Sequence, residues 1–234
     1  MIVVGVVGAS GKTGSAICDI LKLDPKKYKI LEFSSKNQPK ELELICQNSD
    51  VIIDFSSPEM LDSILKYSVK HNSKLIIGTT GFNESQMLKL QEAGKIIPIV
   101  YSANMSVGIN LLTILSSQAV EIVDKNYDIE IIEYHHRYKK DAPSGTALML
   151  AKVLGIEKES RTKIASVRAG GIYGEHHVLF ANQDEVITIN HQALNRNCYA
   201  TGAIKAAKWL LAKPPGFYSM MDVLNYITAK NRLF

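Results

Sequence analysis

The sequence predicts an α/β fold in two parts: a doubly wound parallel sheet, followed by a second α+β domain with a mostly antiparallel sheet. Apolar strand segments alternate with helical segments through residue 100, which is the pattern of repeated βαβ units. A glycine-rich turn joins the first strand to the first helix, a feature of doubly wound sheets. Beyond residue 124, strand segments follow one another without long helices between them, which favours antiparallel pairing.

The first domain is expected to contribute five strands to one parallel sheet. Residues 2–7 form an apolar run interrupted only by Gly5, which is typical of a strand buried on both faces. Further strands are expected at 28–33, 51–55, 75–77 and 96–100, with helices at 14–23, around 41–46, at 58–72, and at 84–93 after an Asn83 cap. Because crossovers between parallel strands are nearly always right-handed, helices should cover both faces of this sheet.

The second domain is expected to begin after Asn104 with a long helix, about 106–124, for which Ser106 is a suitable N-cap. Apolar residues in this helix recur at spacings of three and four, so one of its faces should be buried. Strands are expected at 128–134, 163–168, 174–181 and 185–193, and a helix at 201–211. The chain therefore divides into domains 1–104 and 105–213, with the tail, about 214–234, returning to the first domain.

The composition is that of an ordinary globular protein. Hydrophobic residues make up 46% of the 234 residues, charged residues make up 21%, and the net charge is +4. No run of five or six Lys or Arg occurs, so an acidic small molecule is favoured over nucleic acid as a partner. Cys18, Cys46 and Cys198 lie far apart, which disfavours a disulfide framework and a metal site. Neither a signal peptide nor a membrane-length apolar run is found, so a cytoplasmic protein is expected.

Residues 8–14 read G-x-x-G-x-x-G where the first strand meets the first helix. In a Rossmann-type fold these glycines permit a tight turn, a close approach to a pyrophosphate, and close helix–strand contact. Free N–H groups at the helix start then favour phosphate binding. A structural turn without a ligand is the alternative, but the position at the strand–helix junction favours a dinucleotide site. The predicted cofactor contacts are Gly8, Ala9, Ser10, Gly11, Lys12 and Thr13.

The end of the second strand bears on which dinucleotide is used. Rossmann-type domains that bind NAD carry an acid about 20 residues beyond the glycines, whereas residues 33–36 contain no acid. A serine hydroxyl, Lys36 and Lys12 would tolerate a 2′-phosphate better than a carboxylate would, so NADPH is expected to serve at least as well as NADH. If Lys36 is only a solvated loop residue, this preference loses its basis.

Two further loops follow parallel strands at the same edge of the predicted sheet, at 78–82 and 101–105. Ligands of open α/β sheets bind at the carboxyl ends of the strands, so these small, polar loops are expected to meet the nicotinamide half of the cofactor. Taken alone, each loop could be an ordinary turn. The predicted contacts are Gly78, Thr79, Thr80, Ser102, Ala103, Asn104 and Met105.

Residues 133–147 combine a cationic loop with a helix start. Five possible cations occupy positions 135–140: His135, His136, Arg137, Lys139 and Lys140. Ser144 can cap the helix that follows Pro143, which leaves the amides of Gly145 and Thr146 at its positive end, where a carboxylate would bind. A solvated basic loop with a capping serine is the alternative. The combination of a helix start, two histidines and a dinucleotide turn favours a site for a dianion.

Residues 135–147 resemble the long and specific signature of the dihydrodipicolinate reductase family, also called the 4-hydroxy-tetrahydrodipicolinate reductases. The resemblance extends over nearly the whole chain, through residues 8–14, 54–59, 78–82, 104–110, 168–170, 174–176, 202–203 and 209–210. It implies reduction of 4-hydroxy-tetrahydrodipicolinate to tetrahydrodipicolinate in the diaminopimelate route of lysine biosynthesis. NAD(P)H would deliver hydride to C4 of the substrate after loss of its 4-hydroxyl.

The resemblance also implies roles for individual residues. His135 matches the family's acid/base residue and Lys139 its proton donor. The residues that match contacts to the substrate carboxylates are His136, Ser144, Gly145 and Thr146. The first domain would then bind the dinucleotide, and the second would bind substrate and form the homotetramer that is usual in the family.

The implied reaction agrees with elementary chemistry. Hydride addition across a conjugated C=C bond leaves electron density that a positioned acid must quench with a proton. Histidine titrates near neutral pH without tuning, whereas Lys139 needs cationic neighbours such as His136 and Arg137. Two departures from the family pattern concern the cofactor domain. The segment between the second strand and Asp54 is short, and no acid follows the second strand.

Some conspicuous residues have simpler explanations. His176 and His177 are adjacent on a strand and should point to opposite faces, so a shared metal ion is disfavoured. Asp141 is expected to order its loop rather than act as a base, and Trp209 to lie in the core.

Other classes of protein remain as alternatives. Semialdehyde dehydrogenases share the first domain, but an acylating enzyme needs a nucleophilic cysteine, and none lies in the site loops. A redox-sensing NAD(P)-binding protein would keep the glycine turn but would not need His135 and Lys139. A nucleic-acid-binding module would show a basic patch interleaved with aromatic residues.

Overall fold

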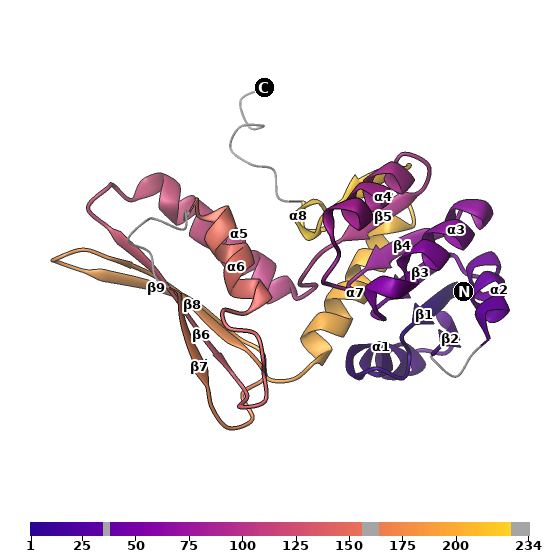
Figure 1. Ribbon diagram of the computed structural model, residues 1–234, viewed down its shortest axis with the longest axis horizontal. Coiled ribbons are helices and arrows are strands. Elements are labelled where there is room, and N and C mark those ends of the chain that lie inside the picture. Colours follow the sequence, from indigo (N-terminus) through magenta and orange to yellow (C-terminus); the bar gives the residue numbers. More distant parts are fainter. Residues whose placement is uncertain (35–37, 156–163, 226–234) are drawn as a thin grey trace. The chain divides into compact units, whose positions relative to one another are not determined.

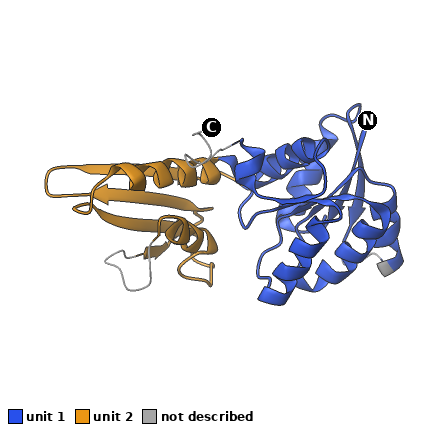
Figure 2. Ribbon diagram, turned by 90° about the horizontal axis from the view of Figure 1, so that it is seen from above, with its two compact units in different colours: residues 1–107, 196–234 blue, residues 108–195 orange. Residues whose placement is uncertain are grey.

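The computed structural model describes residues 1–34, 38–155 and 164–225. The chain divides into two compact units, which are coloured separately in Figure 2. Unit 1 comprises residues 1–107 and 196–234, and unit 2 comprises residues 108–195. No helix within the described ranges has the length and apolar character needed to span a bilayer.

Unit 1 is built on a six-stranded parallel sheet with the order β10-β5-β4-β3-β1-β2 (Figure 1). Its strands are β1 (Ile2–Val7), β2 (Tyr28–Phe33), β3 (Val51–Asp54), β4 (Lys74–Ile77), β5 (Pro98–Tyr101) and β10 (Gly216–Tyr218). Every residue of the central strand β3 is buried, which explains why the sequence shows continuous apolar runs here. At one edge the tail adds β10, in which Phe217 lies opposite Ile99 of β5.

Helices cover both faces of this sheet. α1 (Lys12–Lys22), α7 (Asn197–Leu210) and α8 (Met220–Val223) pack with Val4 and Val6 in one core. On the other face, α2 (Pro39–Gln47), α3 (Leu61–His71) and α4 (Glu84–Gly94) pack with Val7, and a short 3₁₀ helix, η1 (Pro58–Met60), precedes α3. Asn83 caps α4 as predicted, because its side chain accepts a bond from the Gln86 amide at 2.9 Å. The predicted doubly wound sheet is therefore confirmed.

The unit boundary differs from the division expected at residues 105–213. The helix expected at 201–211 begins earlier, as α7, and belongs to unit 1 rather than to the second domain. Its small residues Ala203 and Ala207 are buried in the same core as Ile17 of α1. Gly202 passes so close to the Met105 carbonyl oxygen that a Cβ would overlap it. Its alanines and glycine thus let α7 pack closely against the first sheet.

Unit 2 contains a four-stranded sheet with the order β7-β6-β8-β9. Its strands are β6 (Asp128–His135), β7 (Ile164–Arg168), β8 (Glu175–Ala181) and β9 (Val186–Gln192). β6 pairs with β7 in parallel, and the other two pairings are antiparallel, so the predicted, mostly antiparallel sheet is confirmed. α5 (Val107–Ile122) and α6 (Gly145–Val153) supply Leu112 and Leu150 to a core with Phe180 of β8.

The covered face of the unit 2 sheet also carries ionisable residues. Ile131, Glu133 and His135 alternate along β6 and are all buried. On β8, His176 lies opposite Glu133 in the register and is buried as well. Because residues two apart on a strand share a face, the fold brings a carboxyl group and two imidazoles together in the interior of unit 2.

Candidate active site

Two positions of the glycine turn in unit 1 accept only glycine. Gly8 has a φ of 83°, in the left-handed region, and a Cβ there would overlap the carbonyl oxygen of Phe55. A Cβ on Gly14 would overlap the carbonyl oxygen of Gly8. The first turn of α1 therefore lies directly against the end of β1, as the motif at 8–14 predicts.

Backbone amides of this turn are available to an anion. Three amides hold the turn together by bonding to backbone carbonyls: those of Gly8, Ala9 and Gly11. The amides of Ser10, Lys12 and Thr13 make no backbone hydrogen bond within the described part of the chain. The first turn of α1 also lacks an acidic residue that would neutralise its positive end. These groups fit a pyrophosphate bound at the helix start.

A cavity of about 310 Å³ lies beside the turn at the carboxyl ends of β1, β2 and β3. Its lining includes Gly8, Ser10 and Gly11 from the turn and Phe33 and Ser34 from the end of β2. The carboxyl edge of the central strands is where a doubly wound sheet binds its ligand. The cavity therefore suits the adenosine half of a dinucleotide.

The polar side chain that follows β2 in this cavity is a serine rather than an acid. Glu32, the acid within β2, forms an ion pair with Lys22 of α1 at 2.9 Å and does not line the cavity. Lys12 is exposed at the first position of α1. Lys36, which was expected to favour a 2′-phosphate, lies outside the described residues. The cavity thus presents the Ser34 hydroxyl where NAD-specific domains present a carboxylate.

The other predicted cofactor loops follow β4 and β5, which are neighbours in the sheet. Thr80 and Ala103 are exposed, whereas Thr79 and Asn104 are buried. Met105 as a whole is 1% exposed and lies in the core of unit 1, so the structure does not present it to a ligand. The residues in this group with intermediate exposure are Gly78 and Ser102.

Asp54, at the end of β3, organises the first of these loops. Its carboxylate is buried and accepts hydrogen bonds from the Thr79 hydroxyl at 2.6 Å and from the Ser56 amide at 3.0 Å. Burial raises the pKa of Asp54, against the lowering effect of these bonds. The Phe55 ring lies where a Cβ on Gly78 would project. An acid that ends a fully apolar strand could have revealed this supporting role, which the sequence analysis did not assign.

In unit 2, a cluster of buried ionisable residues surrounds His135. Glu133, fully buried two residues earlier on β6, accepts a hydrogen bond from Nδ1 of His135. Arg168 of β7 donates to both oxygens of Glu133, at 2.6 and 2.9 Å. The ring of His176, from β8, lies edge-on to that of His135 with centroids 5.2 Å apart. No role in this site was predicted from the sequence for Glu133, Arg168 or His176.

Burial and ion pairing act in opposite directions on this cluster. Burial raises the pKa of Glu133, but hydrogen bonds from Arg168, Ser166 and His135 outweigh it and hold that pKa at about 2. Burial lowers the pKa of His135, and the Glu133 carboxylate only partly opposes this. Burial, reinforced by the charge of His135, lowers the pKa of His176 to about 3. At neutral pH the cluster holds one carboxylate, one guanidinium and two imidazoles that favour their neutral forms.

Ser144 links the start of α6 to this cluster. It is the N-cap, as predicted, because its Oγ accepts a bond from the Ala147 amide at 3.2 Å. The same Oγ lies 3.2 Å from Nε2 of His176. The Ser144 amide donates to Glu133 at 3.2 Å. One buried carboxylate therefore fixes both the helix start and the histidine of β6.

The remaining predicted residues lie in the loop before α6 and in its first turn. The Lys139 ammonium forms an ion pair with Asp141 at 2.8 Å and lowers the pKa of that carboxyl. Nδ1 of His136 is buried and has no hydrogen-bond partner among the described residues. A Cβ on Gly145 would meet no atom within 4 Å, so open space adjoins the helix start there. Thr146 follows as the second residue of α6.

The predicted residues separate cleanly between the units. All predicted cofactor residues lie in unit 1, and all predicted catalytic and substrate residues lie in unit 2. His177 points away from the buried cluster and pairs with Glu175 at 2.6 Å. Within the described residues, no three His, Cys, Asp or Glu are grouped as a metal site would require.

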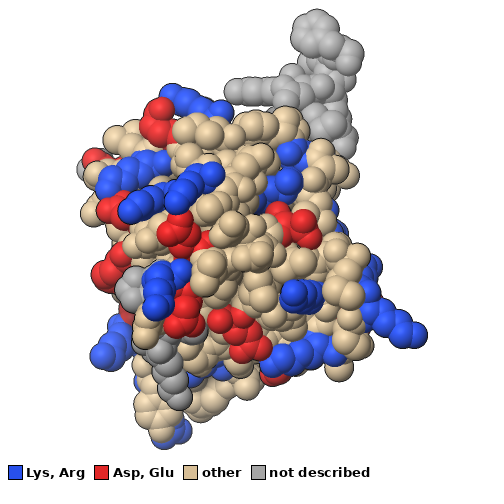
Figure 3. Space-filling model, turned by 90° about the vertical axis from the view of Figure 1, so that its right-hand side faces the viewer, with Lys and Arg blue, Asp and Glu red and all other residues tan. Residues whose placement is uncertain are grey.

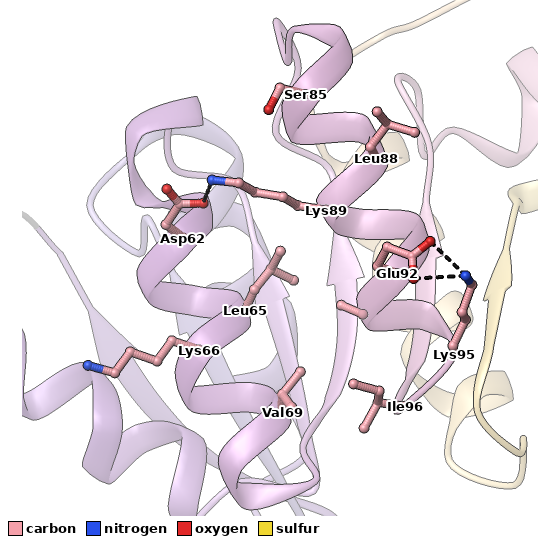
Figure 4. A pocket seen from close by; sticks show the side chains of 11 residues that line it. Asp62, Leu65, Lys66, Val69, Ser85, Leu88, Lys89, Glu92, Lys95 and Ile96 are labelled. Carbon is pink, nitrogen blue, oxygen red and sulfur yellow. Dashed lines mark hydrogen bonds and ion pairs between the residues drawn. The ribbon is translucent and has the colours of Figure 1, made fainter.

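A larger groove, of about 710 Å³, runs between α3 and α4 (Figure 4). Leu65 and Val69 line it from α3, Leu88 and Ile96 line it from the side of α4, and an ion pair between Lys89 and Asp62 spans its upper end at 2.7 Å. None of the predicted site residues lines it.

On the face of the molecule shown in Figure 3, cationic and anionic side chains are interspersed rather than gathered by sign.

Comparison with known proteins places the chain among its relatives. The family model described as "Dihydrodipicolinate reductase, N-terminus" matches residues 2–105, and the C-terminal model of the same family matches residues 108–224. A 4-hydroxy-tetrahydrodipicolinate reductase of Rickettsia bellii is 47% identical and covers 95% of this chain and 96% of its own length. The corresponding protein of Rickettsia akari is 45% identical over 98% of this chain and 99% of its own.

Solved structures share the fold. A dipicolinate-bound dihydrodipicolinate reductase from Paenisporosarcina sp. TG-14 superposes with a TM-score of 0.78 at 21% identity, over 97% of this chain and 100% of that one. A probable dehydrogenase from Thermotoga maritima superposes with a TM-score of 0.65 at 10% identity, over 95% and 92% of the two chains. Since both family models match and the curated relatives are similar over nearly their full lengths, the chain belongs to the dihydrodipicolinate reductase family.

Proposed function

We propose that this chain reduces 4-hydroxy-tetrahydrodipicolinate (dihydrodipicolinate) to tetrahydrodipicolinate with NAD(P)H, and that its own residues supply the proton and bind the dianion. Family membership makes the chain an NAD(P)H-dependent oxidoreductase of the diaminopimelate route of lysine biosynthesis. The observation that carries the residue-level proposal is the burial of His135 against an ionised carboxylate, beside a cationic loop and a helix start.

The cofactor is proposed to bind at the glycine turn of unit 1. NAD(P)H held there supplies the hydride that adds to C4 of the substrate. The free amides of Ser10, Lys12 and Thr13 would hold the pyrophosphate. The loops at 78–80 and 102–105 would hold the nicotinamide half. Because Ser34 rather than an acid lines the cavity beside this turn, and Lys12 lies at the first position of α1, NADPH is favoured slightly over NADH.

The substrate carboxylates are proposed to bind at the start of α6. The amides of Gly145 and Thr146 lie at the positive end of the helix, next to open space. Nδ1 of His136 is buried and has no partner among the described residues, so the ring can bond to a carboxylate. Ser144 orients this helix start through its cap. Two negative charges on the substrate explain why cations converge on this loop.

His135 and Lys139 are proposed to supply the proton. After the substrate loses its 4-hydroxyl as water, hydride adds to C4 of the conjugated C=C bond, and the displaced electron pair takes a proton at C3. Burial disfavours the charged form of His135 in the free protein, but a bound dianion would favour it. Lys139, whose ammonium already pairs with the Asp141 carboxylate, would supply a proton from solvent to the site.

Assembly and location form a separate part of the proposal. The sheet of unit 2 presents exposed apolar residues, with Val186 at 61% and Ile187 at 42% exposure. We expect this sheet to form a homotetramer in the cytoplasm, without nucleic acid or membrane as a partner. Light scattering coupled to gel filtration would reveal the assembly, and a monomeric protein would contradict this part alone.

The test is NAD(P)H oxidation fed by the condensation product of pyruvate and aspartate semialdehyde. Wild type should turn over rapidly, whereas His135→Ala and Lys139→Ala should each lose about 100-fold or more in kcat with cofactor affinity unchanged. Lys140→Ala is the matched control, since it removes an exposed lysine from the same loop. No turnover by wild type, despite tight cofactor binding, would point to a different reductase or to a non-catalytic sensor.

A further inference from the structure

We infer that Glu133 and Arg168 are positioning residues: the Glu133 carboxylate fixes the ring tautomer of His135, and Arg168 fixes the carboxylate. His135 then keeps its proton on Nδ1 and uses Nε2 as the atom that exchanges a proton with the substrate. This inference rests on the proposed function, because it assigns roles relative to the acid of that reaction. Both residues would act through His135 rather than directly on the substrate or the cofactor.

The geometry accounts for both oxygens of Glu133. Oε2 accepts from Nδ1 of His135 and from Nη1 of Arg168, and Oε1 accepts from Nη2 of Arg168 and from the Ser144 amide. Glu133 is fully buried, so water does not compete for these positions. Every one of the four contacts is a donor aimed at an acceptor. The carboxylate can therefore neither rotate nor take up a proton without breaking a bond.

Arg168 does more than neutralise Glu133. It faces His135 in the parallel register between β6 and β7, and its Nη2 also donates to the backbone carbonyl of Asp141 at 2.6 Å. The fork of a guanidinium is planar, so binding both carboxylate oxygens fixes the plane of the carboxylate. Arg168 thus couples the orientation of Glu133 to the loop that carries Lys139.

The tautomer follows from the chemistry of the partners. An ionised carboxylate only accepts hydrogen bonds, so Nδ1 of His135 must carry a proton. The neutral ring then has a bare Nε2, and the charged ring has an Nε2–H that can protonate a substrate carbon. Three other groups face this ring from their own elements: Arg168 on β7, His176 on β8 and Lys139 in the loop. The charges of Arg168 and Lys139 disfavour a positive charge on His135, and His176 is neutral at neutral pH, so Glu133 is the one of these four neighbours that stabilises the charged ring.

The sheet contains a matched control for this arrangement. Glu175 and His177 on β8 repeat the Glu-x-His spacing of Glu133 and His135, and their side chains also pair, at 2.6 Å. This second pair is partly exposed, at 22% and 21%, and lies on the opposite face from the buried cluster. A role for Glu133 in positioning predicts that only the buried pair affects the reaction.

The first experiment is an NMR titration of the ring nitrogens of ¹⁵N-histidine-labelled protein without substrate, with His135→Gln to assign the signal. Wild type should show His135 protonated at Nδ1. In Glu133→Gln, Nη2 of Arg168 and the Ser144 amide can only donate and should hold the single amide oxygen at the Oε1 position, so the amide NH₂ faces His135 and imposes the Nε2–H tautomer. A wild-type His135 protonated at Nε2 would overturn the inference, and this readout does not depend on the proposed reaction.

The second experiment compares kcat and its pH dependence. Glu133→Gln should lower kcat by about 100-fold or more, as loss of the correct histidine tautomer does in other enzymes. It should also move the kinetic pKa of the acid downward, while the KM for NAD(P)H stays unchanged. Arg168→Lys, which keeps the charge but loses the fork, should show a smaller loss in the same direction, and Glu175→Gln should resemble wild type.

These outcomes separate the two hypotheses. Active wild type with an unchanged pH profile in folded Glu133→Gln would contradict the positioning role but leave the proposed function standing. Inactive wild type would contradict the proposed function, while the tautomer measurement would still decide the positioning role. If Glu133→Gln does not fold, the wild-type tautomer and the Arg168→Lys pH profile provide the test.

Discussion

The two halves of the candidate site owe their geometry to opposite means. In unit 1 the predicted contacts are largely backbone groups, and glycines such as Gly8 and Gly14 determine their geometry. In unit 2 the geometry depends on buried ionisable side chains, above all Glu133, Arg168 and His135. The glycine turn of unit 1 depends on close backbone contacts, whereas the buried cluster of unit 2 depends on the charges of its side chains. Variants of the first should therefore fail for steric reasons, and variants of the second for electrostatic and pH-dependent reasons.

The largest expected effect is loss of stability in Arg168→Met. This change leaves the Glu133 carboxylate buried without its main partner, which costs about 3–5 kcal/mol of unfolding free energy. Burial would then raise the pKa of Glu133, so the deficit should shrink as the pH is lowered and the carboxyl group takes up a proton. Chemical denaturation of wild type and variant at several pH values measures both effects.

The double variant Glu133→Gln/Arg168→Met is the control for this prediction. It removes the uncompensated charge, so much of the lost stability should return, and well above pH 4.5, where wild-type Glu133 is ionised in both the folded and the unfolded chain, the difference from wild type should not depend on pH. If the single variant lost the same stability at every pH, the effect would come from packing, and the electrostatic side of the comparison would be wrong.

The second effect is steric and belongs to unit 1. In Gly14→Ala the added Cβ overlaps the Gly8 carbonyl, so α1 must move away from β1, together with the amides that are proposed to hold the pyrophosphate. Affinity for NAD(P)H should fall about 100-fold, which corresponds to about 2.7 kcal/mol. Isothermal titration with the cofactor measures this loss.

Gly145→Ala is the matched glycine of unit 2, because its Cβ would meet nothing within 4 Å in the first turn of α6. Cofactor affinity and stability should both stay close to those of wild type. Equal losses of cofactor affinity in Gly14→Ala and Gly145→Ala would show that the overlap at Gly14 is not the cause of the loss.

The third effect is the pH dependence of stability in unit 2. Burial lowers the pKa of His176 from 6.5 to about 3, so between these values the unfolded chain binds more protons than the folded one. Stability should therefore be fully present above pH 6.5 and fall below it by about 1.4 kcal/mol per pH unit. Hydrogen exchange of β8 amides across this range gives the slope. His176→Gln should flatten it, and an unchanged slope in that variant would assign the effect to other groups.

The parts of the site that lie within one short stretch of sequence could be predicted from residue spacing. The glycines of 8–14 and the run 135–147 each act within one turn or loop, so their residue types and intervals carry the information. The same is true of Ser144, which caps the helix directly after it. The alternation of strands and helices likewise sufficed for the doubly wound sheet, since each βαβ unit is local.

What could not be predicted depends on pairings between distant segments. Arg168 lies 35 residues from the Glu133 carboxylate that it binds, and His176 reaches Ser144 from 32 residues away. Sequence alone does not show which strands become neighbours. Glu133 could therefore be noticed beside the motif, but its pairing with Arg168 could not be predicted. The position of α7 depends in the same way on the contact between Gly202 and Met105, which only the folded chain reveals.

The smallest expected effect concerns the adenosine end of the cavity in unit 1. Ser34→Glu places a carboxylate where NAD-specific Rossmann domains carry one, next to the position of a 2′-phosphate. Repulsion should lower kcat/KM for NADPH by about tenfold, or about 1.4 kcal/mol, and leave kcat/KM for NADH nearly unchanged. If the cofactor is held by backbone groups, as proposed, a side chain at the rim of the cavity should select between cofactors without disturbing the turn. If Ser34→Glu lowered kcat/KM equally for NADPH and NADH, residue 34 would contribute to binding both cofactors. Unit 1 would then depend on side-chain charge much as unit 2 does.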